Sequence, residues 1–184
     1  MSGSHDLALP ALTLVLGGAR SGKSRLAERL VAGTGRPRIY IATAEAWDDE
    51  MAARIDAHRR DRGEGWETIE APRDLGPVLS RVPPDACVLI DCATLWLTNH
   101  LLAEADLEAE TTGLLAALQA CAAPVVVVSN EVGWSIVPEN ALARRFRDDQ
   151  GRLNQRLAAE AGLVVGVMAG LPFVLKGQMP ELAA

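Results

Sequence analysis

The sequence predicts an α/β fold in which a mainly parallel sheet is covered by helices on both faces. Short, continuously apolar segments alternate along the chain with longer segments of helical composition. Such apolar strands are typical of a parallel sheet that is buried on both sides. Hydrophobic residues make up 49% of the 184 residues, which is enough for one sizeable core. A glycine-rich loop follows the first apolar segment and indicates what the fold binds.

This loop, residues 17–24, fits the pattern G-x-x-x-x-G-K-[ST] of a phosphate-binding loop. The apolar residues 12–16 predict a strand before it, and residues 25–31 predict a helix after it, as the pattern requires. Glycines let the backbone turn tightly and point its N–H groups at an anion, and the helix N-terminus adds partial positive charge. The predicted nucleotide-binding residues of the loop are Gly17, Gly18, Ala19, Arg20, Ser21, Gly22, Lys23 and Ser24.

Three side chains of the loop have predicted roles. Lys23 is expected to reach the β- and γ-phosphates and to act in catalysis, and the Ser24 hydroxyl is expected to ligate Mg²⁺. Arg20 supplies a second cation inside the loop. A glycine turn that fits the pattern by chance is the alternative, but the flanking strand and helix argue against it.

The remaining elements continue the alternation of strands and helices. Strands are predicted at 38–43, 66–70, 87–91, 124–130, 163–169 and 172–176, with Gly170-Leu171 as the turn of a closing pair. Helices are predicted at 48–62, 75–81, 93–102, 111–122 and 140–161, and the acidic stretch 104–110 is expected to lead into the fourth of them. Residues 1–11 are expected to form a flexible tail, and residues 12–184 a single catalytic domain.

The strand at 87–91 ends in an acid, Asp91. In phosphate-loop folds an acid at this place holds Mg²⁺ directly or through water. Strands often end in aspartate, however, and Asp91 is also a possible cap for the next helix.

His58 is the histidine with the most informative surroundings. Arg54, His58 and Arg62 are four residues apart and therefore share one face of the predicted helix 48–62. Two guanidinium groups favour the neutral imidazole, which is a nucleophile, and they are able to hold phosphate oxygens. The alternative is a surface helix with a solvated basic face, and composition alone favours it.

Charge and hydropathy exclude several classes of protein. The formal net charge of −6 argues against a general binder of nucleic acid or anionic membranes. The longest weakly polar run, 161–175, is too short to span a bilayer and contains Pro172. No signal peptide is apparent, and the odd number of cysteines suits reduced thiols. We therefore expect a cytoplasmic protein.

Several longer motifs resemble those of a known family. They are the phosphate-binding loop, residues 40–43, 48–51, 54–55 and 58–59, Trp66 with Glu70, and the segments 129–133, 136–140, 145–148 and 151–155. Together they resemble the bifunctional adenosylcobinamide kinase / adenosylcobinamide-phosphate guanylyltransferases of cobalamin biosynthesis. The resemblance runs from Leu12 to about Lys176, and Asn-Glu-Val-Gly together with Val-Pro-Glu-Asn makes it specific.

The resemblance implies two reactions. A nucleoside triphosphate, ATP or GTP, phosphorylates the aminopropanol hydroxyl of adenosylcobinamide. GTP then transfers GMP to His58 with release of pyrophosphate, and the phosphorylated substrate attacks the bound GMP to give adenosylcobinamide-GDP. Some relatives carry a second histidine just before this position, where this chain has Ala57.

Further site residues follow only from the resemblance. It implies nucleotide contacts by Ala42, Thr43, Ala44, Arg59, Arg60, Asp61 and Arg62, by Glu70 at the guanine or ribose, and by Asp91 at Mg²⁺. Some relatives have glutamate in place of Asp91. The resemblance also implies a three-layer P-loop NTPase fold like the RecA core, and a homotrimer that binds the corrinoid between subunits.

Two other functions remain as alternatives. A plain small-molecule kinase needs the loop and Asp91 but no nucleophilic His58. A regulatory GTPase predicts Asp-x-x-Gly after the acidic strand and Asn-Lys-x-Asp for guanine, but Thr94 occupies the glycine position and Glu131 follows Asn130. A nucleic-acid motor is disfavoured by the acidic charge and small size.

Overall fold

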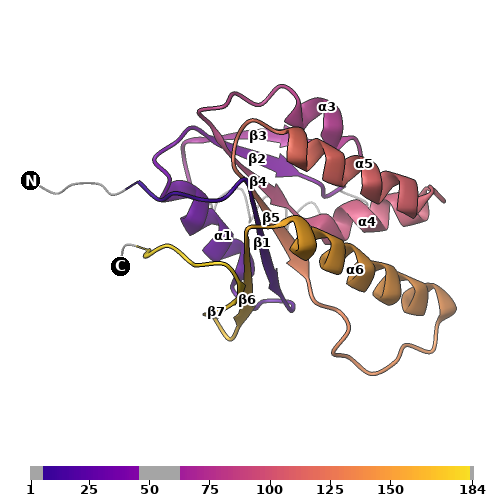
Figure 1. Ribbon diagram of the computed structural model, residues 1–184. Helices are drawn as coiled ribbons and strands as arrows, with labels where there is room; N and C mark the ends of the chain where they lie inside the picture. The colour runs from indigo at the N-terminus through magenta and orange to yellow at the C-terminus, as the bar shows by residue number, and fades with distance from the viewer. Residues whose placement is uncertain (1–5, 46–62, 183–184) are drawn as a thin grey trace, which may run out of the picture.

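The computed structural model of the chain describes residues 6–45 and 63–182. It contains one seven-stranded sheet in the order β3-β2-β4-β5-β1-β6-β7, and every neighbouring pair is parallel except β6 with β7 (Figure 1). The predicted α/β fold with a mainly parallel sheet is confirmed. The predicted helix 48–62 lies outside the described residues.

The bounds of the described elements follow the predicted alternation closely. The strands are β1 (Leu12–Gly17), β2 (Arg38–Ala42), β3 (Trp66–Glu70), β4 (Cys87–Asp91), β5 (Val125–Asn130), β6 (Leu163–Met168) and β7 (Leu171–Lys176). The helices are α1 (Lys23–Ala32), α3 (Leu75–Leu79), α4 (Ala93–Leu102), α5 (Leu107–Ala120) and α6 (Ala141–Glu160).

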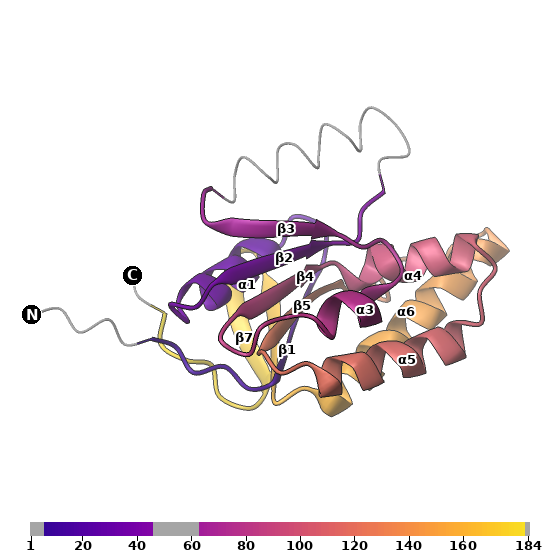
Figure 2. The same ribbon diagram turned by 90° about the horizontal axis from the view of Figure 1, so that it is seen from above.

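Helices lie on both faces of the sheet and enclose two apolar cores. The helices α3 to α6 cover one face, and α1 covers the other (Figures 1 and 2). Within β1, Leu14 faces the first core and Val15 the second, and both are fully buried. Strands buried on both sides need apolar residues at every position, which explains the continuous apolar runs.

One helix begins earlier than predicted. Part of the acidic stretch 104–110, expected to lead into a helix at 111, belongs to α5. The Asp106 carboxylate accepts hydrogen bonds from the backbone N–H groups of Glu108 and Ala109, at 3.1 and 3.2 Å. Glu108 and Glu110 lie in the first turn, where the helix dipole favours negative charge. The acids therefore start the helix instead of separating it from α4.

The ends of the described chain lie on the same side as α1. The Leu7 N–H donates to the Gly33 carbonyl at 2.8 Å, and Leu9 packs against the second core together with Met179 and Leu182. Among the described residues, no helix is both long and apolar enough to cross a membrane.

Two of the cysteines have thiols that the fold makes unreactive. Burial raises the pKa of Cys87 to about 11 and that of Cys92 to about 12, whereas Cys121 is partly exposed. The thiolate is the reactive form, so burial makes Cys87 and Cys92 slow to react.

At pH 8 a disulfide reagent should therefore label one thiol of the folded protein rapidly, and all three thiols in denaturant. Stopped-flow absorbance measures the rate and the number of thiols labelled. Cys121→Ser should abolish the fast phase; two or three fast thiols in the folded protein would contradict the assignment.

Candidate nucleotide-binding site

The sheet brings the predicted site residues to a single edge. Because the first six strands in the order are parallel, their carboxyl ends meet at one edge, where ligands bind in open α/β sheets. Glu70, Ala42, Asp91, Asn130 and Gly17 end five of these strands, in this order across the sheet. Four strand spacings separate β3 from β1, about 19 Å at the usual interval of about 4.8 Å. An extended nucleoside triphosphate has a similar length.

Close packing fixes the phosphate-binding loop beneath this edge. A Cβ atom on Gly17 would collide with the Ser21 Oγ and would lie 2.7 Å from the Val167 carbonyl oxygen. Gly22, with φ of 95°, lies against Gly170, and the Gly170 N–H donates to the Ser21 carbonyl at 2.8 Å. The turn between β6 and β7 therefore packs against the loop and holds it in place.

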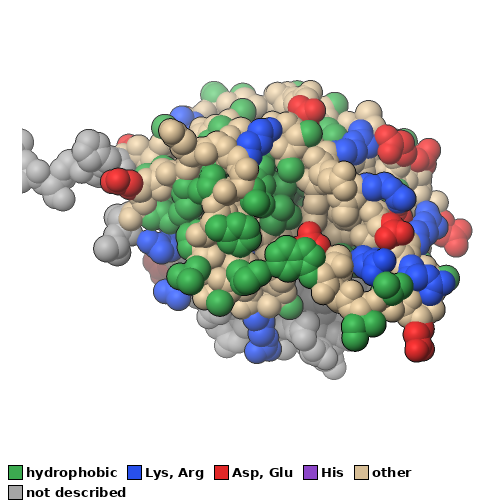
Figure 3. Space-filling view, turned by 60° about the horizontal axis from the view of Figure 1, so that its bottom comes forward, with side chains coloured by type: hydrophobic (Ala, Val, Ile, Leu, Met, Phe, Trp, Pro, Cys, Tyr) green, Lys and Arg blue, Asp and Glu red, His purple; other side chains and the backbone are tan. Residues whose placement is uncertain are grey.

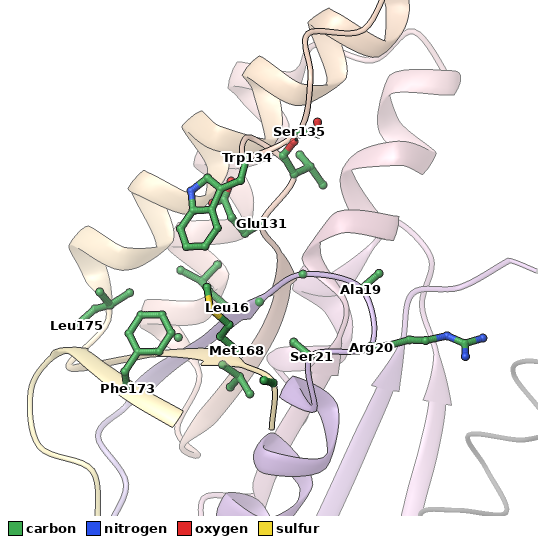
Figure 4. Close-up of a pocket in the computed structure, with 16 residues that line it drawn as sticks. Leu16, Ala19, Arg20, Ser21, Glu131, Trp134, Ser135, Met168, Phe173 and Leu175 are labelled. Atoms are coloured by element: carbon green, nitrogen blue, oxygen red, sulfur yellow. Dashed lines mark hydrogen bonds between the residues drawn. The ribbon is translucent and has the colours of Figure 1, made fainter. Parts of the chain in front are cut away.

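Lys23 lies at the start of α1 and turns back into the loop. Its Nζ donates to the Gly18 carbonyl at 3.0 Å. Burial lowers the pKa of Lys23, while attraction to Cys92 and Asp91 acts in the opposite direction. The lysine thus lies near Asp91, as a phosphate-binding lysine and a metal-binding acid must. Arg20 has a φ of 55°. Its side chain points away from the apolar cavity that opens beside the loop, which is described below and drawn in Figure 4.

Thr43 has a structural role that its sequence position does not reveal. It is fully buried, and its hydroxyl donates to the Cys92 carbonyl at 2.8 Å while accepting from the Cys92 N–H at 2.7 Å. The Asn99 side-chain amide donates to the carbonyls of Thr43 and Pro72, at 2.8 and 2.9 Å. These bonds link the ends of β2, β3 and β4, and they orient Asp91, the last residue of β4.

A buried polar network fixes the end of β5. The Gln150 amide donates to Ser129 Oγ and to Asn154 Oδ1, each at 2.9 Å, and the Ser129 hydroxyl donates to Asn154 Oδ1 at 2.6 Å. The Asn154 amide then donates to the Asn130 carbonyl at 3.1 Å. The inward-facing side chains of Gln150 and Asn154 on α6 therefore hold the end of β5.

The next residue, Glu131, is held beside the phosphate-binding loop. Its N–H donates to the Gly17 carbonyl at 3.1 Å, and the Asn130 N–H donates to Thr94 Oγ1 at 2.8 Å. The Glu131 side chain accepts from the Gly133 N–H at 2.7 Å and is only partly buried.

A mostly apolar cavity of about 500 Å³ opens between this loop, the phosphate-binding loop and the hairpin β6–β7. Figure 4 shows Trp134, Met168, Phe173 and Leu175 around it, with Glu131 close to Trp134. Phe173 pairs with Gly166 across the hairpin, where the missing side chain leaves room for the aromatic ring. Sequence reasoning missed Phe173 and Leu175, because only the antiparallel register of β7 against β6 brings them to this edge.

The structure brings together most of the predicted site and leaves part of it undescribed. The phosphate-binding loop and Asp91 lie together, and Ala42, Ala44 and Glu70 lie farther along the same edge. His58, Arg59, Arg60, Asp61 and Arg62 lie outside the described residues. In the described part of the chain, no three His, Cys, Asp or Glu side chains cluster as a metal site. The hydroxyl of Ser24 and the carboxylate of Asp91 nevertheless suit Mg²⁺, which is commonly held by one or two protein oxygens and substrate phosphates.

Fold and site together define a P-loop nucleotide-binding protein. Solved structures agree with this fold at low sequence identity. A protein from Pyrococcus horikoshii superimposes on this chain with a TM-score of 0.56 at 10% sequence identity. The superposition covers 97% of this chain and 92% of the Pyrococcus horikoshii chain. The flagellar accessory protein FlaH of Methanocaldococcus jannaschii has a TM-score of 0.52 at 12% identity, covering 95% and 82%.

Sequence comparison identifies the family. Residues 13–175 match the cobinamide kinase / cobinamide phosphate guanyltransferase family, and the chain belongs to it. It is 47% identical over 168 residues to the bifunctional adenosylcobalamin biosynthesis protein CobP of Pseudomonas aeruginosa, covering 90% of this chain and 97% of that protein. It is 45% identical over 181 residues to CobU of Escherichia coli, covering 90% and 99%. The predicted family and its two enzyme activities are thus confirmed.

The two glycines at the start of the loop should respond differently to the same change. Gly17→Ala should lower the free energy of unfolding by about 1–3 kcal/mol, because the new methyl group meets Ser21 and Val167. Gly18→Ala is the matched control. No neighbouring atom lies within 4 Å of a Cβ added at Gly18, so the free energy of unfolding should change by less than about 1 kcal/mol. Urea unfolding measures both; equal stability of the two variants would show that Gly17 is not close-packed.

Proposed function

We propose that this protein phosphorylates adenosylcobinamide with ATP or GTP, and then transfers GMP from GTP to the product through a histidine-bound intermediate on His58. Membership of the cobinamide kinase / cobinamide phosphate guanyltransferase family supports both reactions. The structural observation that carries the proposal is the placement of Lys23 near Asp91 at the carboxyl edge of the sheet, with Glu70 farther along that edge.

In the kinase reaction the phosphate-binding loop holds the triphosphate. Backbone N–H groups of the loop and of the start of α1 bind its β- and γ-phosphates, and Lys23 leaves the Gly18 carbonyl to bind them as well. Ser24 and Asp91 hold Mg²⁺, which neutralises charge on the phosphate oxygens when bound. The reaction depends mainly on positioning and electrostatic stabilisation, so a rigid loop is an advantage.

In the guanylyl transfer the same loop holds the pyrophosphate that leaves. The guanosine extends along the sheet edge past Ala42, Thr43 and Ala44 toward Glu70. Ala42 and Ala44 are partly exposed and Glu70 is exposed, which supports this direction. His58 attacks the α-phosphate, and Arg59 to Arg62 contact the nucleotide. A covalent intermediate splits one displacement into two easier ones.

Residues 12–184 act as one catalytic domain in this proposal. Continuous pairing of seven strands between Leu12 and Lys176 supports it, because no part of the sheet is separable from the rest. The substrates are adenosylcobinamide, its phosphate and the two nucleotides; nucleic acid and membranes are not partners.

We also propose that the chain assembles as a homotrimer. Apolar side chains lie exposed on the loop before α6 and on β7. Trp134 is 76% exposed, Ile136 93% and Leu171 71%. Figure 3 shows hydrophobic side chains gathered on the face that contains the carboxyl edge of the sheet. Contiguous apolar surface of this kind marks an interaction site.

Assembly is tested by sedimentation. The unaltered protein should sediment as a trimer, and Ile136→Glu should shift it toward monomer because the interface would have to bury an unpaired charge. Leu102→Glu, at an exposed apolar position on α4, is the control and should leave the trimer intact. A fully active monomer would contradict the proposal.

The histidine intermediate is tested by labelling. Incubation with Mg²⁺ and GTP carrying ³²P at its α-phosphate should leave label on the protein that is labile in acid and stable in base, as a phosphoramidate is. His58→Ala should abolish the label, whereas His5→Ala, in the expected tail, should retain it. A protein that phosphorylates adenosylcobinamide but takes up no label would be a plain kinase instead.

A further inference from the structure

Glu131 lies between the phosphate-binding loop and the apolar cavity. The sheet order places β5 between β1, which leads into the loop, and β4, which ends in Asp91. The residue after β5 therefore lies between the two groups that bind the triphosphate and its Mg²⁺. The bond from the Glu131 N–H to the Gly17 carbonyl fixes this position.

The same carboxylate borders the cavity of about 500 Å³. Beyond it, the walls are apolar and carry two aromatic side chains, Trp134 and Phe173 (Figure 4). In the part of the chain that the structure describes, no Lys or Arg forms an ion pair with Glu131, and its bond from the Gly133 N–H occupies one oxygen, Oε1. A carboxylate with a second oxygen available, at the mouth of an apolar cavity, suits a hydroxyl group carried by a large and largely apolar molecule.

We infer that this cavity receives the alcohol substrate of the kinase reaction and that Glu131 is its general base. This inference rests on the proposed function. The hydroxyl oxygen of the alcohol attacks the γ-phosphorus and forms the new O–P bond, while the bond from the γ-phosphorus to the β–γ bridging oxygen breaks. The hydroxyl proton passes to the Glu131 carboxylate, the nucleoside diphosphate leaves with the electron pair, and Glu131 then loses the proton to water.

A rigid backbone supports this assignment. Three hydrogen bonds hold residues 130 and 131, and they come from three different elements: β1, α4 and α6. A general base must be within hydrogen-bond reach of the proton that it removes, so its backbone needs fixed placement. The exposed side chain of Trp134 then provides an apolar wall that the alcohol covers when it binds.

The guanylyl transfer does not need this base. Its acceptor is a phosphate group that is already ionised, so no hydroxyl proton has to be removed. Glu131 should consequently matter in one of the two reactions only, which separates a catalytic role from a general role in folding or nucleotide binding.

The test compares both reactions in the same variant. Glu131→Gln keeps a carbonyl oxygen for the Gly133 N–H but is not a base. It should lower kinase kcat by about 100-fold or more, with guanylyl transfer to supplied adenosylcobinamide phosphate within about twofold of the unaltered protein. Glu139→Gln, at an exposed carboxylate outside the cavity lining, is the matched control and should leave both reactions unchanged.

A second variant tests the cavity itself. Trp134→Ala should raise the KM for adenosylcobinamide about tenfold with little change in the KM for the nucleotide. Unchanged kinase kcat in Glu131→Gln would overturn the assignment of the base, and so would an equal loss of both reactions. Unchanged KM values in Trp134→Ala would overturn the assignment of the cavity. If the unaltered protein phosphorylated no adenosylcobinamide, the proposed function itself would fail.

Discussion

The site depends on the way β1 is enclosed by its two neighbours. Pairing with β5 and β6 leaves β1 buried at every position except the partly buried Leu16. At Gly17 the chain must turn into the phosphate-binding loop without room for a side chain. Its carbonyl then accepts the bond from Glu131, and the carbonyl of Val167 closes the opposite side. Gly17, Val167 on β6 and Glu131 just after β5 therefore meet at one close-packed point, which links the phosphate-binding loop, the end of β5 and the hairpin.

The phosphate-binding loop after β1 divides the carboxyl edge of the sheet into two parts with different surfaces. From the loop, one direction leads across β5 and β4 to Glu70 on the outer strand β3, a polar route over the ends of parallel strands. The other leads over β6 to the antiparallel β7, where every residue is exposed and most are apolar. A polar nucleotide and a large, largely apolar alcohol make opposite demands on a surface. One phosphate-binding loop between two such surfaces suits an enzyme that joins these substrates.

The sequence allowed most of the fold to be predicted, because strands buried on both faces leave an unambiguous apolar pattern. All seven strands lie where that pattern predicted them. The start of α5 was missed because acids that look like a connection also cap a helix and suit its dipole. The bonds of Thr43 to Cys92, and of Gln150 and Asn154 to Ser129, join positions that are 21 to 49 residues apart. No local pattern encodes such pairs. Contacts implied by family resemblance also gave Thr43 a nucleotide role, without showing that its hydroxyl is already used inside the protein.

The buried network beneath the end of β5 is better explained by positioning than by stability. Gln150 is fully buried, and its Oε1 has no hydrogen-bond partner among the described residues. An unsatisfied buried polar atom costs about 1–3 kcal/mol, which offsets what the two hydrogen bonds donated by Gln150 contribute to the stability of the core. An apolar side chain at this point of α6 would remove the donor that orients Ser129 and Asn154, and Asn154 in turn donates to the Asn130 carbonyl. The network therefore exchanges stability for a fixed chain direction at the residue before Glu131, and this is the place where a displacement of about 1 Å would separate a general base from its substrate.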